Sequence, residues 1–264
     1  MKGRLTVIFN LLFASCLLTG CVRSVYIPVS QNNPLFGENK EVQAVAYVGD
    51  NHVELQAAHN PTKKLAIAAN VYFGSGVSIY DAALGTYGYN ENKKWRWETF
   101  LGYGNNSNYA YQTANYNVLL GKPVKNYEVR SLYDKFYLQP SFGFFSNIKM
   151  YNIKYSFSFS SRISALYFKI YSFKEIDDAA TQQSGQTVYI TNKFFKNSFM
   201  YLLEPCLTNK IGVKNVNVIL QIQGFFPYSE EIDIRNTVFS PGFIFSLGLQ
   251  YNFVFKAKQI ATSN

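Results

Sequence analysis

The sequence predicts an all-β fold, a closed antiparallel transmembrane β-barrel of about ten strands behind a cleaved N-terminal signal. Three observations predict it. A short apolar run follows a positively charged start. From Glu41 onward, apolar and polar residues alternate with a period of two in segments separated by Asn, Lys and Gly turns, which is typical of antiparallel strands. The connections are mostly alternately short and long, as in outer-membrane barrels.

Residues 1–20 form the predicted signal. The apolar stretch from Leu5 to Leu18 has about 14 residues, fewer than the roughly 20 that a membrane-spanning helix needs. The tetrapeptide Leu18-Thr19-Gly20-Cys21 resembles the lipobox of bacterial lipoproteins. The resemblance implies a lipoprotein signal peptide that is cleaved before Cys21, and a covalent lipid on that residue. The alternative is an ordinary secretory signal that happens to end near a cysteine.

Composition restricts the chemistry of the mature chain. Cleavage removes 20 of the 264 residues and leaves 244, enough for one large domain. Cys206 is then the only thiol besides Cys21, so no intramolecular disulfide is expected. Loss of Lys2 and Arg4 lowers the formal net charge from +9 to +7. No nucleic-acid motif is present, so outer-membrane lipids, not nucleic acid, are the expected counter-charge.

The period-two segments predict ten strands. Ten is even, as closed bacterial barrels require when both ends of the chain lie on the same side of the membrane. Most segments are close to the roughly 9 to 11 residues that a tilted spanning strand needs. The predicted strands are residues 41–48, 52–59, 65–74, 81–89, 95–104, 135–145, 151–168, 198–209, 215–225 and 238–253.

Alternation alone fits two architectures. A lipid-tethered soluble sandwich or lipocalin-like cup turns its apolar face inward, whereas an outer-membrane barrel turns it toward lipid. Strand length, the 17% aromatic content and the lipid signal favour the barrel. We therefore predict an acylated N-terminus and extended linker over 21–40, an outer-membrane β-barrel over 41–255 and a C-terminal tail over 256–264.

The long connections are predicted to be outer loops. They comprise residues 105–134, 169–197 and 226–237. Pro140 and Pro205 fall within predicted strands, where each removes a ladder hydrogen bond, and we expect a β-bulge at each.

The last predicted strand carries a candidate assembly signal. Ser246, Gly248, Tyr251 and Phe253 form a pattern that resembles the β-signal read by the outer-membrane barrel-assembly machinery. Its physical basis is an exposed edge strand that pairs with the machinery before the barrel closes. The usual signal stands at or near the C-terminus, whereas here eleven residues follow Phe253.

Several short motifs resemble one family. Together with the lipobox, Tyr26-Ile27-Pro28, Gln139-Pro140-x-Phe142-Gly143-Phe144 and Glu204-Pro205 resemble small outer-membrane β-barrel lipoproteins of Bacteroidota. The resemblance implies the architecture and no particular activity. Surface-displayed lipoproteins of that phylum often carry acidic residues after the acylated cysteine, and Val22-Arg23-Ser24-Val25 has none. This implies a lipid in the inner leaflet, with the N-terminus and C-terminus on the periplasmic side.

Charged residues on the polar face predict the contents of the lumen. Ten strands enclose little more space than eight, so inward charges should pair with one another and plug the lumen. A selectivity lining for a small pore is the alternative. The predicted lumen charges are Glu54, Arg96, Glu98, Lys154, Arg162 and Glu204.

Lysines gather at the predicted periplasmic rim. Long lysine stems can place ammonium groups among anionic lipid heads, or simply solvate the turns. Glu91 is the single acid among them. These lysines are Lys63, Lys64, Lys93, Lys94, Lys149, Lys210, Lys214, Lys256 and Lys258.

The sequence gives little support to catalysis. The only histidines, His52 and His59, lie at opposite ends of one predicted strand, about 23 Å apart at about 3.3 Å per residue. His52 beside Asp50 and Glu54 is the one local candidate, and no nucleophile elbow, HExxH, CxxC or phosphate loop exists. We expect no catalytic residues, no metal and no cofactor beyond the covalent lipid.

These observations predict a non-enzymatic outer-membrane lipoprotein with a plugged lumen. We expect it to act as an accessory or partner-binding component. Its outer loops would contact an envelope component or a larger envelope protein complex. A narrow channel or transport protein is the first alternative. A lipid A-modifying or proteolytic barrel enzyme is the second.

Overall fold

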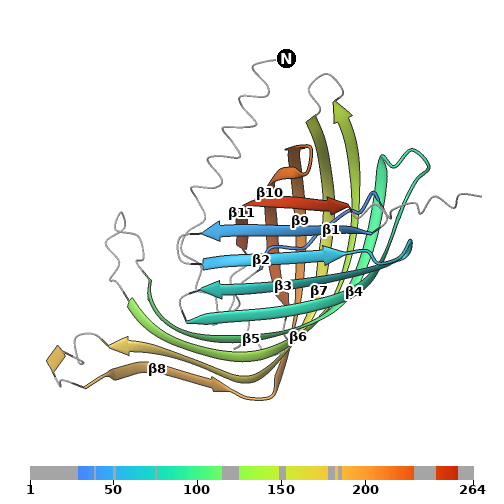
Figure 1. The fold of residues 1–264 in the computed structure, drawn as a ribbon. Coiled ribbons are helices and arrows are strands. Elements are labelled where there is room, and N and C mark those ends of the chain that lie inside the picture. Colours follow the sequence, from blue (N-terminus) through green and yellow to red (C-terminus); the bar gives the residue numbers. More distant parts are fainter. Residues whose placement is uncertain are drawn as a thin grey trace, which may run out of the picture.

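The structure is a computed structural model in which eleven strands form one sheet (Figure 1). It describes residues 29–38, 40–49, 52–74, 76–114, 125–148, 153–177, 182–183, 186–228 and 242–254. Within these ranges, no helix is both long and apolar enough to cross a membrane.

Each strand pairs antiparallel with its neighbours. The strands are β1 (Glu41–Gly49), β2 (His52–His59), β3 (Leu65–Gly74), β4 (Val77–Tyr89), β5 (Trp95–Ala114), β6 (Lys125–Ile148), β7 (Ile153–Asp177), β8 (Val188–Phe195), β9 (Ser198–Val213), β10 (Val216–Tyr228) and β11 (Gly242–Val254).

Ten of these strands close into a ring. Consecutive strands from β1 to β7 pair in order, β7 pairs with β9, and β11 returns to pair with β1. The predicted closed antiparallel barrel of ten strands is therefore confirmed. The remaining strand, β8, lies outside the ring. It pairs with residues 171–177 of β7, beyond residues 153–168 that pair with β9.

The barrel wall is apolar outside and polar inside. Along β9, Tyr201, Leu203 and Leu207 are exposed, whereas Glu204 and Thr208 are fully buried. A soluble barrel would show the opposite arrangement, because exposed aliphatic and aromatic side chains around a closed ring are stable in lipid, not in water. The wall is that of a transmembrane barrel, and the soluble sandwich or cup is excluded as the architecture.

Aromatic rings meet near both ends of the wall. Trp95 stacks on Phe142 with their ring centroids 5.2 Å apart, at the start of β5. Phe73 and Tyr80 meet edge to face, with centroids 5.7 Å apart, where β3 and β4 connect at the opposite end. Aromatic girdles at the two interfaces are typical of transmembrane barrels.

The two ends of the barrel differ in their connections. At one end β2/β3, β4/β5, β6/β7 and β9/β10 are joined by few residues, and we name this the short-turn end. The other end carries the two-residue β1/β2 and β3/β4 turns together with the long β5/β6 and β10/β11 connections and the region between β7 and β9, and we name it the long-connection end. Bacterial barrels place short turns in the periplasm and longer loops outside the cell.

Several strands are longer than the sequence predicts. Residues 105–114 and 125–134, expected in a loop, pair with each other as extensions of β5 and β6. Within the expected loop 169–197, β7 continues and pairs with β8. In Figure 1, β5, β6, β7 and β8 project together beyond the rest of the barrel. We name this four-stranded extension the projecting sheet. Its strands escape sequence prediction because, beyond the lipid, a strand needs no apolar alternation.

The predicted bulges at Pro140 and Pro205 are wrong. Pro140 pairs with Thr99 of β5, and Pro205 pairs with Ser161 of β7, with no shift of register. Each proline interrupts only the ladder on its other side, where register resumes unchanged. A proline lacks one N–H, which points toward a single neighbour, so the second ladder stays intact. The shift in β6 falls instead between Leu132 and Tyr133.

Candidate functional site

The lumen contains the chain's own N-terminal segment, residues 29–38. This segment belongs to the linker that the sequence predicts over 21–40, and it passes inside the ring before β1 begins (Figure 1). Residues 29–37 are all buried, and Gln31 has a relative exposure of 0%. The predicted lumen plug of paired charges is therefore incomplete, since a peptide occupies the lumen as well.

The wall holds the N-terminal segment by its backbone carbonyls. Six successive carbonyl oxygens, from Ser30 to Leu35, each accept a hydrogen bond from a side chain of a different strand, at 2.5 to 2.9 Å. Buried carbonyls need such partners, because an unpaired one costs about 1–3 kcal/mol. The donors, in order along the segment, are Gln56, Gln221, Gln139, Lys210, Gln43 and Arg96.

Buried carboxylates of the wall accept the segment's amide protons. The Ser30 nitrogen donates to Glu54 at 3.2 Å, and the Leu35 nitrogen lies 3.0 Å from both carboxylate oxygens of Glu98. The nitrogens of Gly37 and Glu38 donate to Oε2 of Glu41 at 3.2 and 3.3 Å. A buried polar group that is left without a hydrogen-bond partner costs free energy. The segment thus helps to compensate three acids that the wall buries.

Two amide side chains of the segment bind across the lumen. Nε2 of Gln31 donates to the backbone carbonyl of Glu204 at 2.5 Å, and its Oε1 accepts from Ser160 at 2.8 Å. Nδ2 of Asn33 donates to Ser160 and Thr208, at 2.8 and 3.0 Å. Its Oδ1 accepts from Gln139 and Ser141, at 2.9 and 3.1 Å. Such satisfied buried amides fix the register of the segment.

Apolar contacts anchor both ends of the segment. Phe36 lies in a buried cluster and meets the Tyr87 ring edge to face, with centroids 5.4 Å apart. Val29 packs with Tyr72, Val77 and Ile79 near the β3/β4 connection. Full burial of a side chain such as phenylalanine contributes about 1.5–3 kcal/mol.

Three predicted lumen charges bind the segment directly. Glu54 and Glu98 accept its amide protons, and Nη1 of Arg96 donates to the Leu35 carbonyl at 2.7 Å. The sequence predicts that the lumen charges pair with one another. It does not predict these contacts with the segment.

The other three lie on the same inner face. Arg162 and Glu204 are direct cross-strand neighbours on β7 and β9, and both are buried. Nε of Arg162 also donates to Gln139 at 3.0 Å, so it supports a residue that binds the segment. Lys154 is half-buried near the short-turn end.

Further inner charges escape sequence prediction. Asp81 and Lys135 form a buried ion pair at 3.7 Å. The predicted strands begin at these two residues, which makes them look like rim positions. Lys210, predicted at the periplasmic rim, is instead buried and binds the Asn33 carbonyl. Strand parity identifies it, because Lys210 continues the inward row of Glu204 and Thr208.

The remaining rim lysines fall into three groups. Lys63, Lys64, Lys94 and Lys214 are exposed at the short-turn end, as is Glu91. Lys93 pairs with Glu38 at 3.1 Å, where the N-terminal segment leaves the lumen. Lys149, Lys256 and Lys258 lie outside the described residues.

The candidate catalytic residues His52 and Glu54 both make structural contacts. His52 stacks on Tyr72 with ring centroids 4.9 Å apart, and Glu54 is engaged by the segment and by Gln56 and Asn70. Asp50 lies outside the described residues. Across the part of the chain that the structure describes, no group of three or more His, Cys, Asp or Glu could hold a metal ion.

The residues of the predicted assembly signal have structural roles in the closed barrel. Gly248 is covered by Tyr47 of β1, and a Cβ atom there would lie 2.5 Å from the Tyr47 ring. Ser246 Oγ accepts a hydrogen bond from Ser30 Oγ at 2.9 Å. Tyr251 and Phe253 are exposed on the membrane face, with ring centroids 4.4 Å apart. Whether the assembly machinery reads them stays a prediction.

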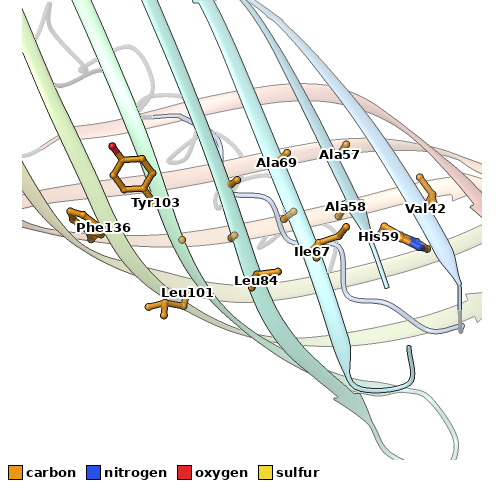
Figure 2. Close-up of a pocket in the computed structure, with 14 residues that line it drawn as sticks. Val42, Ala57, Ala58, His59, Ile67, Ala69, Leu84, Leu101, Tyr103 and Phe136 are labelled. Atoms are coloured by element: carbon orange, nitrogen blue, oxygen red, sulfur yellow. The ribbon is translucent and has the colours of Figure 1, made fainter. Parts of the chain in front are cut away.

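The outer wall carries a shallow apolar groove of about 680 Å³ across β1 to β6. Figure 2 shows the small side chains of Ala57 and Ala69 beside the larger Ile67, Leu84 and Leu101. The groove arises because alanines stand opposite one another on adjacent strands. It faces lipid, and its lining is almost entirely apolar, so it supplies no chemistry.

Comparison with known proteins gives weak structural matches. No known protein family and no curated protein matches the sequence. Among solved structures, a KdgM porin is similar, with 10% identity, a TM-score of 0.32 and coverage of 81% of this chain and 99% of that one. The structure of KdgM porin in complex with disordered oligogalacturonate is 10% identical, with a TM-score of 0.31 and the same coverage. The translocator domain of autotransporter NalP from Neisseria meningitidis is 7% identical, with a TM-score of 0.30 and coverage of 83% of this chain and 90% of that one.

Proposed function

We propose that the protein is a non-enzymatic outer-membrane β-barrel lipoprotein whose lumen is closed by its own N-terminal segment. The apolar outer wall supports this location, because bacterial barrels of this construction reside in the outer membrane. The predicted signal and the acylation of Cys21, which lies outside the described residues, belong to the same proposal. So does membership of the Bacteroidota family that the motifs resemble.

The observation that carries the proposal is the series of hydrogen bonds to six successive carbonyls of the segment. A peptide that is hydrogen-bonded by side chains of six strands occupies the lumen in one fixed position. The cavity beside Pro34 and Leu35 has about 30 Å³. A water needs about 10–15 Å³, so this space holds only a few waters. A cavity of this size beside Pro34 and Leu35 does not admit a hydrated ion.

The projecting sheet supports a role in contacting a partner or an envelope component. It extends past the membrane-spanning part of the wall, and its exposed side chains include Tyr109, Tyr189 and Phe194. Aromatic residues are enriched in the cores of protein interfaces. A closed barrel that presents such a sheet fits an accessory component of a larger envelope protein complex.

Conductance in planar bilayers tests closure of the lumen. We expect the full-length protein to give no steady current, and a steady ohmic current would contradict the proposal. Co-purification from native membranes in mild detergent tests the partner role. A partner retained by the full chain, and lost when residues 112–127, which end β5 and begin β6, are replaced by a short turn, would support it.

A gated channel is the second candidate function. This function is favoured because side chains of the wall hold the segment. The strand ladders therefore do not depend on the segment. Departure of the segment would expose the charged inner face. Conductance that appears under voltage or with an added solute, and disappears when the segment is crosslinked to the wall, would establish this function instead.

A further inference from the structure

The N-terminal segment has a direction, and three strands report it independently. Along β2 its contacts advance from Glu54 to Ala57 and then to Asn60 just beyond the strand, as the segment runs from Ser30 through Asn32 to Glu38. Along β9 they advance from Glu204 at Gln31 to Thr208 and Lys210 at Asn33.

The third strand agrees. Along β6 the contacts move from Gln139 at Asn32 to Ser141 at Asn33, and Gly143 lies against Leu35. Both β2 and β6 run toward the short-turn end, and so does β9. The segment therefore runs from the long-connection end toward the short-turn end.

The two ends of the segment confirm this direction. Val29 packs beside the β3/β4 connection, at the long-connection end. Glu38 meets Lys93 and Asn60, next to the β4/β5 and β2/β3 turns of the short-turn end. Because β1 also starts there, the chain crosses the lumen once before it enters the wall.

We infer that the mature N-terminus emerges on the outer face of the membrane, so that the predicted lipid of Cys21 is displayed in the outer leaflet. A return toward the periplasm would take the chain past the N-terminal segment inside the lumen. Beside Pro34 and Leu35 the lumen offers a cavity of about 30 Å³, which is too small for a second strand of peptide. The eight residues from Cys21 to Val29 span at most about 29 Å at about 3.6 Å each, enough to reach the outer leaflet from the lumen mouth.

This inference reverses the periplasmic placement that the sequence predicts for the N-terminus. That prediction depends on the even number of strands and on the absence of acidic residues after Cys21. The direction of the segment depends instead on contacts with three strands. The C-terminal strand still ends at the short-turn end, since Val254 pairs with Glu41. The two termini then lie on opposite sides of the membrane.

Cysteine accessibility in intact cells tests the inference. Ser24→Cys would be treated with a membrane-impermeant maleimide, alongside Thr187→Cys in the long β7/β8 connection and Asn92→Cys in the β4/β5 turn. Thr187 and Asn92 are both exposed. The unmodified protein is the matched control, because Cys206 is buried and the Cys21 thiol is expected to carry lipid.

We expect Ser24→Cys to label in intact cells to the same extent as Thr187→Cys. Labelling only after permeabilisation, as for Asn92→Cys, would overturn the inference. An epitope inserted after Ser24 and read with an antibody gives the same decision if the cysteine variant assembles poorly. Closure of the lumen is measured separately by conductance, so a periplasmic N-terminus with a silent barrel would refute this inference alone.

Discussion

Both carboxylate oxygens of Glu98 lie 3.0 Å from the backbone nitrogen of Leu35. An acid buried inside the wall thus obtains a hydrogen-bond donor from a peptide that precedes the barrel in the sequence. The same relationship recurs between Glu54 and Ser30 and between Glu41 and Gly37. The N-terminal segment and the inner face therefore form one hydrogen-bonded unit.

Removal of the Glu98 carboxylate should loosen the segment. Loss of Glu98 leaves the buried Leu35 N–H without its acceptor, which costs about 1–3 kcal/mol and corresponds to a roughly 5- to 150-fold increase in opening. We expect Glu98→Ala to speed hydrogen exchange of the segment amides by this factor, measured by mass spectrometry. Glu91→Ala, in an exposed turn, is the control. Unchanged exchange in Glu98→Ala would show that this acid does not hold the segment.

Phe36 should stabilise the whole barrel. Truncation of a buried phenylalanine costs about 3–5 kcal/mol, because it removes packing and leaves a cavity. We expect Phe36→Ala to unfold at a clearly lower temperature when heat-modifiable migration on gels is followed. Phe159→Ala removes the same atoms from the membrane face, where the side chain is 49% exposed, and should shift the transition less. Equal shifts would contradict the anchoring role.

Mutations of the buried pair of Asp81 and Lys135 should have non-additive effects on stability. Loss of one member of a buried pair costs about 3–5 kcal/mol, because the partner keeps an uncompensated charge. We expect Asp81→Asn and Lys135→Met each to destabilise the barrel, and the double variant to recover part of the loss. Lys93→Met breaks an exposed pair and should change stability by less than about 1 kcal/mol. Additive single effects in a double-mutant cycle would contradict coupling.

Gly248 allows a distinction between packing and recognition by the assembly machinery. A Cβ atom there would lie 2.5 Å from the Tyr47 ring, so Gly248→Val should lower the yield of assembled barrel in cells. We expect Tyr47→Ala to restore assembly in the double variant if the glycine only makes room for the ring. A double variant that folds in detergent but fails to assemble in cells would support recognition of the glycine itself.

The sequence predicts those parts of the fold that lipid dictates. Alternation marks the wall wherever it crosses the membrane, so the ten strands of the ring are found and their closure is confirmed. Where the strands leave the lipid, as in residues 105–114, the apolar pattern ends although pairing continues. Local turn residues could not identify β8, which pairs with the extension of β7.

The candidate site is harder to predict, because it depends on a peptide with no secondary structure. Residues Ser30 to Asn33 look like an ordinary polar linker in the sequence, and only the register of the wall shows that they are buried. The sequence predicts which charged residues face inward, because alternate residues of a strand share one face, but it does not predict what those residues bind. Gln139, Gly143 and Glu204 all contact the segment.

Single-channel conductance of a variant that lacks residues 29–38 tests closure of the lumen most directly. We predict a silent full-length protein, a conducting deletion variant, and block of that current by a synthetic peptide of residues 29–38 but not by a scrambled peptide. If the deletion variant fails to assemble, the double variant Phe36→Ala with Glu98→Ala takes its place. A full-length protein that conducts as well as the variant would contradict the account.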